Sequence, residues 1–219
     1  MSRYYYDNSN PLASIPPATL NLLIINIIMF VATRLNENFM IGTFAMFFPT
    51  SPFFRIWQPI TYMFMHGGFA HIFFNMWALW MFGAALERAI GTKKFLILYF
   101  VAGLGALLIH TGFQYVQIAT GLSSYTNIAR TPILGASGAL YGVQIAFAML
   151  YPDSVWTLIF PPVSLKAKWF VLIFVAIELF FGITGTAEGV AHFAHLGGML
   201  FGWLLILYWK KTGHLYDRY

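Results

Sequence analysis

The chain contains no cysteine, and only 9% of its 219 residues are charged. The absence of thiols excludes disulfide bonds, cysteine nucleophiles and thiolate metal sites. An ordinary soluble domain carries about 25% charged residues, so 12 basic and 7 acidic side chains are too few for a soluble surface of this size. Because 59% of the residues are apolar, disorder and collagen-like structure are excluded too. The composition therefore indicates an integral membrane protein.

Six apolar stretches are long enough to cross a hydrocarbon core of about 30 Å, which takes roughly 17 to 25 helical residues. The sequence predicts an all-α, polytopic membrane protein, a six-helix transmembrane bundle that forms a single domain over residues 1–219. Short tails, residues 1–11 and 210–219, flank the bundle. The predicted spans are residues 12–31, 69–86, 95–113, 133–151, 167–183 and 190–209.

Lysine and arginine residues are distributed unevenly between the predicted spans. Cytoplasmic loops of membrane proteins carry an excess of these residues, and six spans place both termini on one side. With both termini cytoplasmic, nine cations lie inside and three outside, so the net charge of +5 reflects topology and not nucleic-acid binding. Residues 1–17 lack the pattern of a cleavable signal, so we expect the first helix to be retained. The inside set is Arg3, Arg88, Lys93, Lys94, Lys166, Lys168, Lys210, Lys211 and Arg218, and the outside set is Arg34, Arg55 and Arg130.

Two predicted outer connections are unusual. Residues 36–65 are rich in Phe, Met and Trp and contain Pro49, Pro52 and Pro59. This segment is too interrupted to span and too apolar for water, so we expect it in the membrane interface or re-entering the bilayer edge. Residues 114–132 are polar, and they lead directly into the fourth span.

Ser137 lies at the start of the fourth predicted span, between Gly135 and Gly138 in the sequence GASGALYG. A serine flanked by glycines at the beginning of a helix has an unobstructed hydroxyl group. Tyr141 follows four residues later, about 40° away on the same helix face. Small residues are also ordinary packing material between membrane helices, and Gly138 and Gly142 form a GxxxG pair. Taken alone, this motif favours helix packing.

His195 shares one face of the last predicted span with Gly198 and Gly202. Glycines on that face allow another helix to come close enough for the imidazole to touch it. His192 lies about 60° around the helix and is either a second functional group or a hydrogen-bonded polar neighbour. A lone intramembrane histidine is more often structural, but a facing helix with a glycine-flanked serine favours a functional role.

His71 and Asn75 are four residues apart at the start of the second span, so both can donate hydrogen bonds toward one point. His66 precedes Gly67 and Gly68, and we expect it outside the helix. Metal binding is the competing interpretation. A five-residue spacing turns two histidines about 140° apart on a continuous helix, and no acidic ligand is near in sequence, so we expect no metal and no other cofactor.

Three acidic residues, Glu87, Glu178 and Glu188, lie in or near the spans. Glu178 is in the middle of the fifth span, where a charge costs about 2.5 to 3.5 kcal/mol on insertion scales. We expect it to be protonated or hydrogen-bonded to a neighbour, in a structural role. Glu188 is two helical turns from His195, too far to orient that side chain.

A serine, a histidine and two side-chain donors are the groups that acyl transfer needs. Serine is a weak nucleophile and requires a base within about 2.6 to 3.2 Å, a role that suits His195. The backbone N–H of Ser137, the Asn75 amide and the His71 ring could form an oxyanion hole. No aspartate is placed to complete a triad, so the sequence predicts a dyad whose histidine is oriented by packing, with Tyr141 as the candidate.

The segments HGGFAHIFFN, GASGALYG and AHLGGMLFG together resemble the three signatures of rhomboid intramembrane serine proteases, over the whole six-span chain. The resemblance implies a dyad of Ser137 and His195, with Tyr141 stacked beneath the histidine. It also implies that His71 and Asn75 form the oxyanion hole.

The same resemblance implies a water-accessible site below the outer membrane surface, which substrates reach laterally between helices. Its expected partners are the lipid bilayer and single-span membrane proteins, cut near the outer face. Rhomboids commonly have Trp followed by Arg in the first outer loop. Here Trp57 is followed by Gln58, so the usual arginine anchor is absent.

The sequence therefore favours a rhomboid-type serine endopeptidase of a bacterial cytoplasmic membrane. A catalytically silent rhomboid-like binding or quality-control protein is one alternative, although such a protein should have lost Ser137 or His195. A transporter or metal-dependent membrane protein is another, and it leaves the GASG motif unexplained. Its ligands or proton relays would be His66, His71, His110, His192 and His195.

Overall fold

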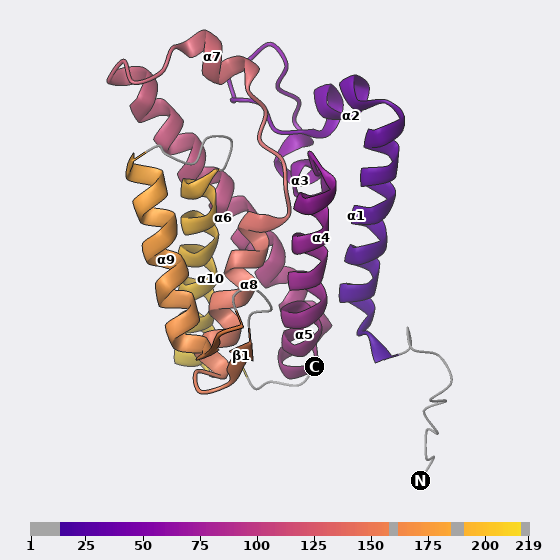
Figure 1. The fold of residues 1–219 in the computed structure, drawn as a ribbon, viewed down its shortest axis with the longest axis vertical. Coiled ribbons are helices and arrows are strands. Elements are labelled where there is room, and N and C mark those ends of the chain that lie inside the picture. The colour runs from indigo at the N-terminus through magenta and orange to yellow at the C-terminus, as the bar shows by residue number, and fades with distance from the viewer. Residues whose placement is uncertain (1–13, 158–161, 185–190, 216–219) are drawn as a thin grey trace.

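The computed structural model describes residues 14–157, 162–184 and 191–215, which form a helical bundle with one short hairpin (Figure 1). The helices are α1 (Pro17–Leu35), α2 (Glu37–Phe44), α3 (Gln58–Thr61), α4 (Phe69–Ala78), α5 (Ala84–Ile90), α6 (Thr92–Ala119), α7 (Tyr125–Arg130), α8 (Ser137–Leu150), α9 (Ala167–Thr184) and α10 (His192–Thr212). A 3₁₀ turn, η2 (Tyr62–Phe64), follows α3, and a π-helical segment, η3 (Leu79–Gly83), joins α4 to α5. The hairpin pairs β1 (Val155–Thr157) with β2 (Ser164–Lys166) in antiparallel register.

Five helical segments of the described chain are long and apolar enough to cross a membrane, and α8 is a shorter apolar helix. The five are α1, the continuous run Phe69–Ile90, α6, α9 and α10. The chain is therefore an all-α, multi-pass membrane protein, as predicted. The first helix begins at Pro17 and not at residue 12, and residues 12 and 13 lie outside the described part.

The fourth predicted span, residues 133–151, is wrong at its start. Ile133 is extended and forms a β-bridge with Met46, and Gly135 has φ of 132°. The helix begins only at Ser137 and contains 14 residues. At 1.5 Å per residue it is about 21 Å long, which is shorter than a hydrocarbon core of about 30 Å.

Helices α6, α8 and α10 pack against one another and form the centre of the bundle, with α9 against α8 and α10. Glycines set these contacts. A side chain on Gly198 would overlap the carbonyl of Gly138, and a Cβ atom on Gly202 would lie 2.6 Å from the carbonyl oxygen of Gly142. The close approach of α8 to α10 that the two glycine motifs predict is therefore present.

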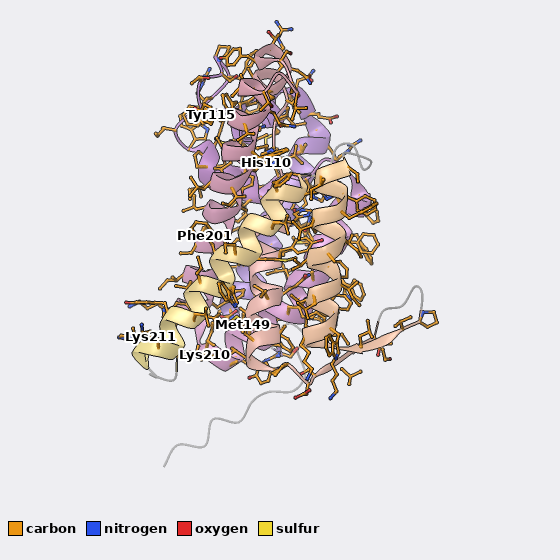
Figure 2. All side chains as sticks on the ribbon, turned by 90° about the vertical axis from the view of Figure 1, so that its left-hand side faces the viewer. His110, Tyr115, Met149, Phe201, Lys210 and Lys211 are labelled. Atoms are coloured by element: carbon orange, nitrogen blue, oxygen red, sulfur yellow. The ribbon has the colours of Figure 1, made fainter. Side chains whose placement is uncertain are left out.

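The basic residues are segregated at the two ends of the bundle. Helix α1 begins and α10 ends at the end that also holds α5, the start of α6 and the hairpin (Figure 1). Figure 2 shows Lys210 and Lys211 at this end, where Lys210 Nζ donates to the Met149 carbonyl over 3.0 Å. Among the described residues, this end carries Arg88, Lys93, Lys94, Lys166, Lys168, Lys210 and Lys211, whereas Arg34, Arg55 and Arg130 belong to elements at the opposite end.

Two buried polar side chains hold neighbouring segments of the chain in place through hydrogen bonds to backbone N–H and carbonyl groups. The Glu87 carboxylate caps α1, accepting the backbone N–H groups of Ala18 at 3.0 Å and Thr19 at 2.7 Å. The fully buried amide of Gln58 accepts the N–H of Arg55 over 3.1 Å and donates to the Phe53 carbonyl over 3.1 Å. Gln58 thus anchors the first outer connection from the position next to Trp57.

We expect Gly198→Ala to lower the free energy of unfolding by about 1–3 kcal/mol, because overpacking a close helix contact forces the backbones apart. The same change should separate α8 from α10 and abolish any activity that needs Ser137 next to His195. Thermal unfolding of the purified protein in detergent measures the effect. Gly112→Ala is the matched control, because a Cβ atom there meets nothing within 4 Å. Equal stability of the two variants would contradict the packing argument.

Candidate active site

Ser137 lies inside the bundle because the chain that precedes it descends from α7 between the helices (Figure 1). Gly135 makes this path possible. Its positive φ favours glycine, and its N–H donates to the Tyr62 carbonyl over 3.0 Å. A Cβ atom on Gly135 would lie 2.8 Å from His71 Nε2 and 3.5 Å from Ser137 Oγ. The missing side chain therefore leaves a space that both groups face.

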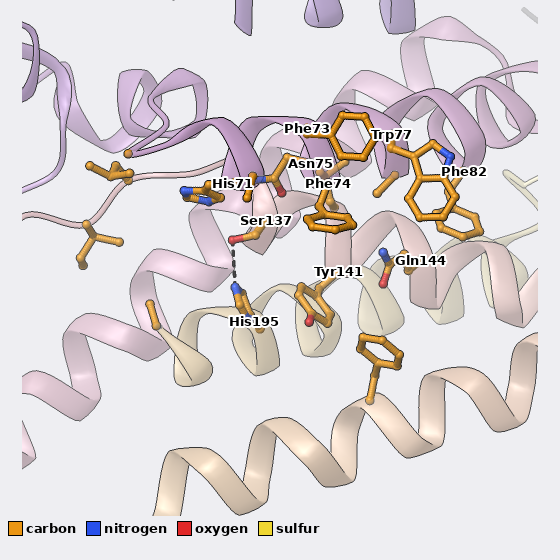
Figure 3. Close-up of a pocket in the computed structure, with 18 of the residues that line it drawn as sticks. His71, Phe73, Phe74, Asn75, Trp77, Phe82, Ser137, Tyr141, Gln144 and His195 are labelled. Atoms are coloured by element: carbon orange, nitrogen blue, oxygen red, sulfur yellow. Dashed lines mark hydrogen bonds between the residues drawn. The ribbon is translucent and has the colours of Figure 1, made fainter. Parts of the chain in front are cut away.

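His195 meets Ser137 from the facing helix α10. Its Nε2 atom lies 2.8 Å from Ser137 Oγ, the contact drawn as a dashed line in Figure 3. The ring of Tyr141 stacks on the imidazole with centroids 4.3 Å apart and an interplanar angle of 22°. Ser137, Tyr141 and His195 are thus in contact, as predicted. The distance is within the range that proton transfer requires.

His71 and Asn75 lie on the side of Ser137 away from His195 (Figure 3). Asn75 is buried, and its Nδ2 atom has no hydrogen-bond partner among the described residues. The N–H of Ser137 belongs to the first turn of α8, whose N–H groups have no partner within the helix. The structure thus gathers the three donors that the sequence nominated for an oxyanion hole.

His66 precedes α4, as predicted, and its ring packs edge-on against His71 with centroids 4.9 Å apart. The angle of about 140° expected for two histidines on one continuous helix does not apply, because His66 lies before the start of α4. Burial and the neighbouring His71 lower the pKa of His66 to about 3, so the imidazole is neutral. His66 supports the His71 ring from behind.

Glu178 is hydrogen-bonded to neighbouring side chains, as the sequence predicted, but its contact with His195 was not predicted. Its Oε1 atom lies 2.9 Å from His195 Nδ1, and its Oε2 atom lies 2.6 Å from His192 Nδ1. Tyr141 also donates its hydroxyl to Oε1 over 2.6 Å. Orientation of His195 by packing alone is therefore an incomplete description. The available signal was the cost of an acidic side chain in mid-span, which requires polar partners. Glu188, the other acidic residue considered near His195, lies outside the described residues.

Glu178, His192 and His195 are also the described residues best placed to hold a metal ion, with one ligand atom from each within 4.8 Å of the others. Their N to O separations of 2.6 and 2.9 Å are those of direct hydrogen bonds. Imidazole nitrogens and carboxylate oxygens each lie about 2.0–2.2 Å from a bound zinc ion. A metal would therefore need these hydrogen bonds to open.

A cavity of about 1360 Å³ adjoins Ser137 and His195. Phe73 and Phe74 of α4 line it and are more than half exposed, and Phe174 of α9 lines it as well, so the cavity reaches the lipid-facing surface between α4 and α9. Its polar wall includes His110 and Gln114. His110 Nδ1 and Gln114 Oε1 are buried and have no hydrogen-bond partner among the described residues.

The family model "Rhomboid domain" matches residues 54–211. The chain therefore belongs to the rhomboid family of membrane proteases. Its long apolar helices fit the membrane character of that family. It is 29% identical to Rhomboid protease AarA of Providencia stuartii over 161 residues, 72% of this chain and 57% of that protein. It is 31% identical to RHOMBOID-like protein 12, mitochondrial, of Arabidopsis thaliana, over 82% of this chain and 54% of that protein.

A third relative is Presenilin-associated rhomboid-like protein, mitochondrial, of Bos taurus, 32% identical over 68% of this chain and 38% of that protein. The chain thus spans from about four-tenths to somewhat over half of the length of these relatives. The relatives include both bacterial and mitochondrial proteins.

If this site cleaves peptide bonds with Asn75 as an oxyanion-hole donor, Asn75→Ala should lower kcat roughly 10²- to 10³-fold, the usual effect of removing one such donor. The unpartnered Nδ2 atom makes no hydrogen bond that the variant would lose. The unfolding temperature should therefore change little. Cleavage kinetics in liposomes measure the effect, with Asn127→Ala on the exposed helix α7 as the control. Wild-type kcat in Asn75→Ala would remove Asn75 from the site.

Proposed function

We propose that this rhomboid is an intramembrane serine endopeptidase, in which Ser137 is the nucleophile and His195 the general base and acid. One observation carries the proposal: Ser137 Oγ lies 2.8 Å from His195 Nε2 at the wall of a cavity inside the bundle. A hydroxyl and an imidazole at this distance can exchange a proton while the oxygen attacks a carbonyl.

The first half of the proposed reaction forms an acyl-enzyme. Ser137 Oγ bonds to the scissile carbonyl carbon as its proton passes to His195 Nε2, and the carbonyl π pair moves onto oxygen. The His71 ring, the Asn75 amide and the backbone N–H of Ser137 donate hydrogen bonds that stabilise that oxyanion. When the C–N bond breaks, the Nε2 proton passes to the leaving amine, and the carbonyl re-forms as an ester of Ser137.

Hydrolysis then reverses these roles. A water molecule loses one proton to His195 Nε2 as its oxygen bonds to the ester carbon, and Ser137 Oγ leaves with that proton. The polar residues His110 and Gln114 in the lining of the cavity support the presence of water inside the membrane. Polar backbone at membrane depth is tolerated where it lines such a cavity, as the stretch before Ser137 does.

The proposed substrates are single-span membrane proteins that approach from the lipid between α4 and α9. The lining of the cavity by exposed phenylalanines supports this route. A bound substrate must be extended near the scissile bond, because a helix keeps its carbonyls in its own hydrogen bonds. Cleavage would occur near the membrane face opposite the cation-rich end. That end follows the rule for cytoplasmic loops, so we place it on the cytoplasmic side of a bacterial membrane. We treat residues 1–219 as a single domain.

The decisive experiment is cleavage of a panel of tagged single-span proteins by the purified protein in liposomes. Ser137→Ala and His195→Ala should each lower kcat at least 10³-fold, because the nucleophile and its base act as a unit. Ser123→Ala and His214→Ala, which lie outside the cavity lining, are the controls. A chelator should have no effect, whereas loss of cleavage on chelation would favour the metal-dependent alternative.

Two further results would overturn the proposal. Cleavage that survives Ser137→Ala would remove Ser137 as the nucleophile. A wild-type protein that cleaves no member of the panel, and whose Ser137 does not react with a fluorophosphonate probe, would favour the catalytically silent rhomboid-like protein.

A further inference from the structure

We infer that Glu178 is a positioning residue for the proposed active site, a carboxylate that holds His195 in the tautomer and orientation that a general base needs. Ser137, His195 and Glu178 then form a hydrogen-bonded chain of three side chains from three different helices, α8, α10 and α9. The inference rests on the proposed function, because it assigns a role to Glu178 through His195.

The two ring nitrogens of His195 have different partners. Nε2 faces Ser137 Oγ at 2.8 Å, and Nδ1 faces Glu178 Oε1 at 2.9 Å. An ionised carboxylate only accepts hydrogen bonds, so its presence requires the proton of a neutral imidazole to be on Nδ1. Nε2 then carries a lone pair directed at the serine hydroxyl. The contact with Glu178 thus selects the tautomer that can accept the Ser137 proton.

Glu178 is itself held from two further sides. His192 Nδ1 lies 2.6 Å from Oε2, and the Tyr141 hydroxyl donates to Oε1 over 2.6 Å. Only 5% of the Glu178 surface is exposed. Hydrogen bonds to a charged acceptor are about twice as strong as neutral ones, and three of them offset much of the cost of burying a carboxylate. The side chain is therefore fixed and cannot swing away from His195 without breaking contacts to two other residues.

Glu178 stabilises charge without taking part in bond making. When Ser137 attacks, its proton moves to Nε2 and His195 becomes an imidazolium. The Nδ1 proton stays on the ring and remains donated to the carboxylate, whose charge now faces the positive ring. The Nε2 proton leaves with the amine, and the neutral Nδ1–H tautomer returns. No proton is transferred to Glu178 at any step.

The stacked Tyr141 ring alone would not achieve this selection. Stacking fixes the plane of the imidazole, with centroids 4.3 Å apart. The ring can still rotate by 180° about its Cβ–Cγ bond and return to the same plane. A flip would exchange the positions of carbon and nitrogen atoms and remove both hydrogen bonds. Glu178 distinguishes the two orientations, and Tyr141 does not.

Glu178→Gln tests the role, because glutamine keeps the shape and removes the charge. We expect kcat to fall on the order of 10²- to 10⁴-fold, as loss of the orienting carboxylate does in serine proteases, with KM within about twofold. The rate at which a fluorophosphonate labels Ser137 should fall in parallel. Glu178→Asp keeps the charge and should recover at least about tenfold of the lost rate.

Glu87→Gln is the matched control, because Glu87 is also a buried carboxylate with several hydrogen bonds, but it caps α1 and does not line the cavity. This variant should lower the unfolding temperature while the folded protein keeps wild-type kcat and labelling rate. Wild-type kcat and labelling in Glu178→Gln would overturn the inference.

¹⁵N spectra of histidine-labelled protein supply a readout that does not depend on cleavage, with the His195 signals assigned by their loss in His195→Asn. We expect a protonated Nδ1 and an unprotonated Nε2 in the wild type, and loss of this single tautomer in Glu178→Gln. A wild-type His195 protonated on Nε2 would overturn the inference. The expected spectra in a protein that cleaves nothing would refute the proposed function and leave the role of Glu178 in holding the ring intact.

Discussion

The close contact between α8 and α10 is the constraint on which the rest of the site depends. Gly138 and Gly142 on one helix face Gly198 and Gly202 on the other, and a side chain at any of these positions would strike the opposite backbone or a neighbouring helix. Apolar helices in lipid gain no hydrophobic energy from association, so packing of small residues and polar contacts must hold them together. The same contact that stabilises the centre of the bundle brings Ser137 to His195.

Polar chemistry inside an apolar bundle needs each charged or polar group to have a partner or an aqueous space. This chain uses both solutions. Glu178 is surrounded by donors from α8 and α10, whereas His110 and Gln114 face the cavity. The result is a site with a buried, fixed side behind His195 and an open side in front of Ser137.

The sequence predicted the membrane class, the six apolar helices and the residues around Ser137, because these depend on composition and on spacing within one helix. It placed the start of α8 too early. Residues 133–136 are as apolar as a helix, and only the backbone conformation of Gly135 and the bridge from Ile133 to Met46 end the pattern. The short hairpin was missed for a similar reason, since two strands of three residues leave little pattern to detect.

The partner of Glu178 could not be predicted because it depends on how α9 packs against α8 and α10. Tyr141, His192 and His195 are 37, 14 and 17 residues away along the chain, and no local spacing rule joins them. Gln58 shows the same limit at the outer connection. Its side chain makes hydrogen bonds to the backbone of Phe53 and Arg55. The sequence showed only that the usual arginine was absent and did not predict these bonds.

The short length of α8 bears on the depth of Ser137 in the bilayer. The helix ends beside Lys210 at the cation-rich end, and its length of about 21 Å is about 9 Å less than the thickness of a hydrocarbon core of about 30 Å. If α8 ends at the cation-rich surface and runs along the bilayer normal, Ser137 lies below the opposite surface by about that difference. A membrane-anchored chain that enters the cavity would present whichever peptide bond lies at that depth. Bilayer thickness, and the tilt with which a substrate helix accommodates it, would then set the register of the cut as much as side-chain recognition does.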